Sequence, residues 1–134
     1  MLVRFLAHYE TEIMNEQHDW LNAIAGTEFA YLTTTGRSSG KLHRIEIWFG
    51  VSDGRIYVMS GGREKSDWVQ NLIAEPQVTI EIGDKTVRGF ATILEEGTDA
   101  DRTARMLLVQ KYQKKDELKG WGENSLAIAV DVID

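Results

Sequence analysis

Residues 45–60 read Ile45-Glu-Ile-Trp-Phe-Gly-Val51, then Ser52-Asp-Gly54, then Arg55-Ile-Tyr-Val-Met-Ser60. The first segment alternates large apolar side chains with Glu46, Trp48 and Gly50, which is the period-two pattern of a strand. An Asp-Gly pair between two such segments is a strong signal for a tight hairpin turn. The stretch therefore predicts a strand over 45–51, a turn, and a return strand over 56–59.

The flanking sequence extends this pattern in both directions. The same periodicities predict strands over 29–34, 78–82, 87–93 and 126–132, and helices over 11–25, over 66–74 and from Thr98 onward. About six mostly antiparallel strands with helices in three connections indicate a mainly β (α+β) domain rather than a doubly wound parallel sheet. A small closed or half-open barrel fits best, because closure protects the edges of the strands.

Composition narrows the class of protein. The 134 residues show no repeat or linker, which predicts one domain over 1–134. The absence of cysteine excludes disulfide scaffolds, thiolate zinc sites and cysteine nucleophiles, and the three histidines lack metal-ligand spacing, so we expect no metal site. A net charge of −6 argues against nucleic-acid binding. The first residues resemble neither a signal peptide nor a membrane span, so we expect a cytoplasmic protein.

Charge is nevertheless concentrated in one loop. Residues 31–44 contain three basic residues and no acidic one, and the segment Thr33-Thr-Thr-Gly-Arg-Ser-Ser-Gly-Lys41 combines glycines, hydroxyls and cations. Glycines let backbone N–H groups approach an anion, while hydroxyls, arginine and lysine donate further hydrogen bonds. The spacing is not that of a P-loop. The segment is either an anion-binding loop or a solvated hairpin loop.

A second loop, Gly61-Gly-Arg-Glu-Lys65, runs into the helix predicted over 66–74. Unpaired N–H groups in the first turn of a helix favour anions. If the strands over 45–51 and 55–60 pair, both basic loops lie beside one hairpin and form a phosphate pocket. The alternative is an ordinary helix start in which Glu64 and Asp67 cancel the charge.

A third feature is the face formed by Glu46, Trp48, Tyr57 and Met59. Aromatic and thioether side chains can stack on a planar ring, although such residues are more often core. No serine–histidine–aspartate grouping is visible. Anion-binding loops without acid–base or nucleophilic groups indicate a protein that holds a cofactor and lets the cofactor perform the chemistry.

Three segments resemble one known family: Thr34-Thr-Gly-Arg-Ser-Ser-Gly-Lys-Leu-His-Arg-Ile-Glu-Ile-Trp-Phe49, Asp53-Gly-Arg-Ile-Tyr-Val-Met-Ser60 and Trp68-Val-Gln-Asn-Leu-Ile-Ala-Glu-Pro-Gln-Val78. They are similar to the deazaflavin (F420)-dependent nitroreductase family, within the split β-barrel flavoproteins that include pyridoxamine 5′-phosphate oxidase. The match runs from about Phe29 to Ile93. Near the C-terminus, where several members have a tyrosine-rich segment, this chain has only Tyr112 and then Trp121, which argues against nitroimidazole as the acceptor.

The resemblance implies an FMN-binding-type split barrel, a homodimer, and hydride transfer from reduced F420 to a small electron acceptor: a quinone, an enone or a nitroaromatic compound. By position, the phosphate or anionic tail would lie on the basic loops, and the ring would lie along Trp48 and residues 57–60. The implied cofactor-binding residues are Thr35, Arg37, Ser39, Lys41, His43, Trp48, Tyr57, Met59, Ser60, Lys65, Trp68 and Asn71. Tyr112 is a candidate proton donor.

Two alternatives remain open at this stage. An FMN-binding flavin reductase or oxidase would use the same barrel, since a phosphate and a polyglutamate tail both favour Arg37 and Lys41. A non-enzymatic cofactor or small-molecule binder would show binding without turnover.

Overall fold

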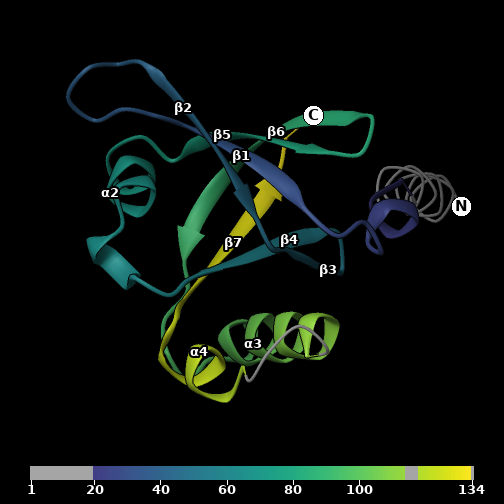
Figure 1. Ribbon diagram of the computed structural model, residues 1–134. Coiled ribbons are helices and arrows are strands. Elements are labelled where there is room, and N and C mark those ends of the chain that lie inside the picture. Colours follow the sequence, from purple (N-terminus) through teal and green to yellow (C-terminus); the bar gives the residue numbers. More distant parts are fainter. Residues whose placement is uncertain (1–19, 114–117, 134) are drawn as a thin grey trace, which may run out of the picture.

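The computed structural model describes residues 20–113 and 118–133 (Figure 1). Seven strands form one antiparallel sheet: β1 (Ala30–Thr35), β2 (Leu42–Ile47), β3 (Gly50–Ser52), β4 (Arg55–Ser60), β5 (Gln77–Ile82), β6 (Lys85–Ile93) and β7 (Leu126–Val132). The helices are the 3-10 turn η1 (Arg63–Lys65), α2 (Asp67–Ala74), α3 (Asp99–Tyr112) and α4 (Lys119–Asn124). The predicted mainly β barrel with helices is confirmed.

The order of the strands explains why the sheet curls into a barrel. It is β2-β1-β5-β6-β7-β4-β3, so β2 and β3 lie at its two edges. Only Trp48 and Phe49 separate these two strands in the chain. Three Cα–Cα steps span about 11 Å at most, so the edges have to approach each other. We call Trp48 and Phe49 the seam.

The seam corrects the strand predicted over 45–51. That stretch is two strands, because β2 pairs with β1 while β3 pairs with β4, and this raises the count from six to seven. The alternation of faces still persists through the seam: Phe49 lies in the barrel interior, and Trp48 packs outside it. The predicted hairpin turn is present, with Asp53 at φ 50° and Gly54 at φ 75°, values typical of Asp-Gly turns.

The barrel interior is the main core. Buried side chains from β1, β4, β5, β6 and β7 meet there with Val69 and Leu72 of α2, and the partly buried Ile45 and Ile47 of β2 pack against them. Ile56 and Val58 of β4 face this interior, whereas Tyr57 and Met59 face outward. The outward pair belongs to a second core beneath α3 and α4, which pack against one side of the barrel while α2 lies at another (Figure 1).

The sequence predicts some of the helices better than others. Thr98 is the N-cap of α3, and its hydroxyl accepts from the Asp101 N–H at 3.3 Å, as its capping pattern predicts. The helix predicted over 66–74 begins at Asp67. Of the helix predicted over 11–25, residues 20–24 are helical, and residues 11–19 lie outside the described residues. The six-residue α4 was not predicted, because its two glycines give no apolar periodicity.

Candidate functional site

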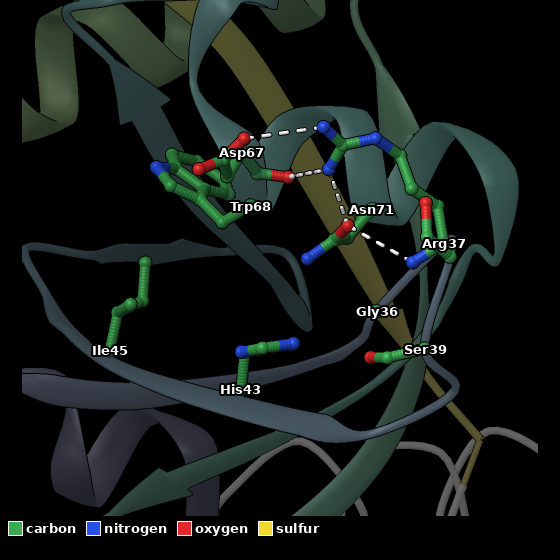
Figure 2. Close-up of a pocket in the computed structure, with 9 residues that line it drawn as sticks. Gly36, Arg37, Ser39, His43, Ile45, Asp67, Trp68 and Asn71 are labelled. Carbon is green, nitrogen blue, oxygen red and sulfur yellow. Dashed lines mark hydrogen bonds and ion pairs between the residues drawn. The ribbon is translucent and has the colours of Figure 1, made fainter.

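A cavity of about 430 Å³ opens between the β1–β2 loop and the first turn of α2 (Figure 2). Its volume lies within the range of small-molecule sites. The loop and strand β2 supply one side, and α2 supplies the other. Its lining residues are Gly36, Arg37, Ser38, Ser39, His43, Ile45, Asp67, Trp68 and Asn71.

The β1–β2 loop folds back on itself to form its side of the cavity. The Gly36 N–H donates to the Lys41 carbonyl at 2.7 Å, and the Gly40 N–H donates to the Gly36 carbonyl at 2.9 Å. A Cβ at position 36 would lie 2.7 Å from Ser39 Oγ and 2.8 Å from His43 Nε2. A larger residue at position 36 would therefore displace these two side chains from over the loop backbone.

Arg37 joins the loop to α2. Its Nη1 donates to Asn71 Oδ1 at 2.8 Å and to the Asp67 carbonyl at 3.4 Å, and its Nη2 donates to Asp67 Oδ1 at 3.2 Å (Figure 2). Its backbone N–H also donates to Asn71 Oδ1, at 3.2 Å. The β1–β2 loop thus meets α2 through one cation, Arg37, whereas no residue of the second basic loop, 61–65, lines the cavity.

The side chain of Asn71 fixes the position of Arg37 between the β1–β2 loop and α2. Its side chain is buried, and its Nδ2 lies 3.4 Å from Oγ1 of Thr34, which is also buried in β1. Its Oδ1 faces Arg37. A buried amide with partners on both ends stays in one orientation, so Asn71 holds Arg37 at a defined place beside the cavity.

The remaining lining residues give the cavity a polar end and an apolar end. Ser38, Ser39 and His43 provide hydroxyl and imidazole groups, while Ile45 and Trp68 provide apolar surface. Ser39 lies on the Arg37 side of the cavity, and Ile45 lies on the far side (Figure 2). The first turn of α2 adds N–H groups, since Ser66 at its N-cap makes no side-chain capping bond. Such a site can bind an anionic group at one end and an apolar portion of the same molecule at the other.

A second, smaller hollow of about 270 Å³ adjoins the seam. It is lined by Phe29, Glu46, Ile47, Trp48, Met59 and Trp121. Trp48 stacks on Tyr112 with ring centroids 4.3 Å apart and an interplanar angle of 4°, and it meets Trp121 edge-on at 5.5 Å. Two of the expected ring-binding residues, Trp48 and Met59, therefore lie here and not in the cavity at Arg37.

The structure brings together five of the residues implied by the resemblance: Arg37, Ser39, His43, Trp68 and Asn71. Lys41 and Lys65 are exposed and do not line the cavity, and Thr35 lines a separate hollow with Leu42 and Gln77. The two basic loops also do not lie beside one hairpin, since β2 pairs with β1 and not with β4.

Tyr57 and Ser60 are buried. Tyr57 belongs to the core beneath α3, and Ser60 Oγ pairs with Ser66 Oγ at 2.9 Å and donates to the Arg63 carbonyl at 3.1 Å. Both side chains are used by the fold, and neither lines one of the two hollows described above.

Tyr112, the candidate proton donor, is placed at the seam. Its hydroxyl accepts from the Phe49 N–H at 3.1 Å and lies 2.8 Å from the Glu28 carbonyl and 3.1 Å from the Phe49 carbonyl. Burial raises the pKa of this phenol, opposed by the hydrogen bond to the Phe49 backbone. These contacts give Tyr112 a structural role, because its one proton is already shared with backbone carbonyls.

Lys111 is the neighbouring cation at the seam. Its Nζ donates to the Phe49 carbonyl at 3.1 Å and lies 3.6 Å from the centroid of the Phe49 ring. Burial lowers the pKa of this amine from 10.5 to about 8. The last turn of α3 therefore fixes the seam through both Lys111 and Tyr112.

Two classes of site are not seen in residues 20–113 and 118–133. No three histidine, aspartate or glutamate side chains lie together as metal ligands. Within the same ranges, no helix has the length and apolar character needed to cross a membrane.

Sequence reasoning missed Gly36, Ser38, Ile45 and Asp67 as lining residues. Gly36 and Ser38 lie inside the basic loop over 33–41, so the sequence locates this loop but not every residue of it that lines the cavity. Ile45 was interpreted only as a core residue of a strand. Asp67 was considered as a charge that cancels the basic loop, which is the relevant signal, since its carboxylate binds Arg37.

Comparison with known proteins finds the same fold in solved structures. One solved structure with a similar fold is an F420-H2 dependent reductase, 25% identical, covering 77% of this chain and 93% of that chain with a TM-score of 0.63. A candidate pyridoxamine 5′-phosphate oxidase from Listeria innocua is 15% identical, covering 87% and 94%, with a TM-score of 0.66. A third structure, a domain-swapped dimer, is 19% identical, covering 98% and 100%, with a TM-score of 0.64.

The most specific match is to a family and spans nearly the whole chain. Residues 8–132 match the family described as F420H(2)-dependent quinone reductase. The matched range contains every strand of the barrel and both sides of the cavity at Arg37. The chain therefore belongs to the F420H(2)-dependent quinone reductase family.

Proposed function

We propose that this protein is an oxidoreductase that binds reduced F420 in the cavity at Arg37 and passes a hydride to a quinone-type electrophile. The observation that carries the proposal is the meeting of the β1–β2 loop and α2 around the Arg37 guanidinium. A guanidinium is the side chain best suited to a phosphate or carboxylate, since its planar fork donates two hydrogen bonds. The family match and the similarity to an F420-H2 dependent reductase support the choice of cofactor.

The residues present fit an anionic cofactor of this kind. The cavity combines one fixed arginine, two serine hydroxyls and an imidazole at its polar end with Trp68 and Ile45 at its apolar end. Ser39 Oγ and His43 Nε2 both lie close over Gly36, which places a hydroxyl and an imidazole together at the polar end of the cavity. The phosphate and polyglutamate tail of F420 would be held by Arg37, Ser38, Ser39 and His43.

When bound, reduced F420 supplies the hydride, so no side chain of this chain needs to act as a nucleophile. Arg37, fixed by Asn71, would bind and orient the anionic portion. Trp68 and Ile45 would exclude water from the apolar portion, which strengthens electrostatic contacts inside the site. These are binding and positioning roles.

The hollow at the seam is the proposed place of the acceptor. Trp48, Met59, Phe29 and Trp121 surround it. Aromatic and thioether groups favour a flat, electron-poor ring such as a quinone. β2 runs along both sites, since Ile45 lines the cavity and Ile47 lines the hollow, so the ring of F420 would have to extend along β2 from the cavity to meet the acceptor.

The test is an anaerobic assay of the purified full chain with reduced F420 and a soluble quinone. We expect quinone-dependent oxidation of F420 that saturates with both reactants. The same assay with FMN in place of F420 tests the alternative of an FMN-dependent reductase or oxidase. Tight FMN binding and FMN-dependent turnover, with no F420 binding, would overturn the proposal. Saturable F420 binding without turnover on quinones, enones or nitroaromatics would favour a non-enzymatic binder.

We also propose that the chain forms a homodimer, as two-fold dimers are the commonest oligomers. One structure with a similar fold is a domain-swapped dimer. Leu42 in β2 is 73% exposed, and Phe90 in β6 is 45% exposed, which gives apolar surface for a partner. Sedimentation equilibrium should give twice the mass of one 15.2 kDa chain, and a single-chain mass across the concentration range would contradict it.

A further inference from the structure

The cavity at Arg37 already contains an anion, the side chain of Asp67. Its Oδ1 lies 3.2 Å from Arg37 Nη2, in the position that an anionic group of a ligand would take on the guanidinium (Figure 2). The Asp67 side chain is 91% exposed and that of Arg37 is 40% exposed. An exposed ion pair of this kind is worth little, so a ligand can displace it.

The carboxylate is not needed to hold Arg37 in place. Arg37 Nη1 is bound by Asn71 Oδ1 at 2.8 Å and by the main-chain carbonyl of Asp67 at 3.4 Å. The Arg37 backbone N–H is bound by Asn71 Oδ1 as well. Only Nη2 depends on the carboxylate, so its removal frees one face of the guanidinium and leaves the other three contacts intact.

Asp67 also sets the charge of the cavity. Arg37 and Asp67 are the lining residues that carry a full charge at neutral pH, and they cancel each other. A ligand anion therefore meets a neutral pair and has to compete with Asp67 for Nη2. A like charge within a few ångströms opposes an incoming anion by about fivefold in affinity even at the dielectric constant of water.

We propose that Asp67 is a specificity-determining residue that competes with the anionic ligand for Arg37. It lowers the affinity of the cavity for anions in general, so that only ligands with further contacts, such as a phosphate joined to an apolar ring system, displace it. This deepens the proposed function and rests on it for the identity of the ligand. The competition itself concerns any anion that binds Arg37.

The test compares Asp67→Asn with Asp99→Asn in the full chain. Asp99 is a matched control, because it is also the first residue of a helix, its side chain is 96% exposed, and it pairs with an arginine, Arg102. Both substitutions remove the same charge from the first turn of a helix. Asp67→Ser is a second variant, since an asparagine oxygen can still accept from Arg37. Thermal unfolding checks that all variants remain folded.

Two probes are titrated by calorimetry: oxidised F420 and inorganic pyrophosphate. We expect Asp67→Asn and Asp67→Ser to bind both probes about five- to tenfold more tightly than the wild type at low salt. The gain should shrink at high salt, where charges are screened. Asp99→Asn should stay within about twofold of the wild type.

The outcomes separate this proposal from the proposed function. Tighter pyrophosphate binding by the Asp67 variants, with no F420 binding by any protein, would support the competition and overturn the choice of cofactor. Equal or weaker binding of both probes by the Asp67 variants would overturn the competition. Failure of both probes to bind any protein would overturn both proposals.

Discussion

Two arginine–aspartate pairs in this protein have the same chemistry and different surroundings. Asp101 and Arg105, in α3, have side chains that are only 6% and 17% exposed, and Asp101 Oδ1 lies 3.0 Å from Arg105 Nη2. Arg37 and Asp67, at the cavity, are 40% and 91% exposed, with 3.2 Å between Nη2 and Oδ1. Burial is the main difference between them.

The partners of each pair follow from that difference. Asp101 also accepts from the Gly97 N–H at 3.1 Å, and Arg105 donates to the Gly122 carbonyl at 2.8 Å, so the buried pair joins the start of α3 to α4. The exposed pair faces a cavity and can exchange its partner. We infer that the buried pair stabilises the fold, whereas the exposed pair controls binding.

The largest expected effect is on stability. Asp101→Ala leaves Arg105 without its carboxylate in a buried place, and removal of one partner of a buried pair costs about 3 kcal/mol. Urea unfolding should show this loss. The control is Asp99→Ala, whose partner Arg102 is exposed, with an expected change of about 0.5 kcal/mol. Equal losses in the two variants would contradict the structural role of the Asp101–Arg105 pair.

The Asp101–Arg105 pair also makes the free energy of unfolding depend on pH in the acid range. Burial opposes ionisation of Asp101, but the Arg105 side chain, the Gly97 N–H and Arg102 together hold the pKa of this carboxyl below its usual value. A depressed pKa contributes stability that is present above the unfolded-state value and is lost as the pH falls through the folded-state value. Urea unfolding should therefore show a steeper loss below about pH 4 in the wild type than in Asp101→Asn. Parallel curves would contradict it.

For the exposed Arg37–Asp67 pair we expect the opposite: substitution should change ligand affinity more than it changes stability. Arg37→Ala removes charge-assisted hydrogen bonds to the ligand, so F420 affinity should fall by about 1.5–3 kcal/mol, or about 10- to 150-fold. Stability should change by less than about 0.5 kcal/mol, as for other surface substitutions. Fluorescence titration and urea unfolding measure the two quantities. Lys65→Ala, outside the cavity, should weaken binding less than Arg37→Ala, and the reverse order would move the anion site toward η1.

A smaller loss of stability is expected at the seam. Tyr112→Phe removes the hydroxyl from the Phe49 N–H and from the Glu28 and Phe49 carbonyls, which costs about 1–2 kcal/mol because the two Phe49 groups are buried. Tyr31→Phe is the control, since that hydroxyl makes one exposed contact of 3.4 Å to Glu46. Chemical denaturation of both variants measures the difference, and equal stabilities would show that the hydroxyl does not hold the seam.

A further effect on stability is a dependence on alkaline pH. Burial lowers the pKa of Lys111 to about 8. The unfolded chain therefore binds more protons than the folded chain between about pH 8 and the ordinary lysine value of about 10.5, and stability should rise with pH in that window. The wild type minus Lys111→Met difference in unfolding free energy should increase from about pH 7.5 to about pH 9.5. A constant difference would contradict the burial of this amine.

The sequence predicts the barrel well where signals are local. The Asp53-Gly54 turn, the Thr98 N-cap and the apolar alternation of the strands each depend on a few neighbouring residues, and each is present. The break at Trp48 and Phe49 was missed because it is caused by a change of pairing partner, from β1 to β4. Periodicity carries no information on partners, and it continues unchanged across the break.

The candidate site was predicted in part. Residue types located the two loops, since glycine, serine and arginine in one short loop suggest an anion site. The sequence could not show that Arg37, rather than Lys41 or Lys65, reaches the cavity, because this depends on the Asn71 side chain 34 residues away. The sequence also could not show that the Tyr112 hydroxyl is hydrogen-bonded to the backbone of Phe49 and Glu28.

A crystal structure of the full chain with F420 would test most directly whether the ligand binds at the exposed Arg37–Asp67 pair. We expect the anionic portion of F420 to lie on Arg37 Nη2, with the Asp67 carboxylate displaced and Asn71 still bound to Nη1. F420 bound elsewhere, with the Arg37–Asp67 pair intact, would contradict the proposed site.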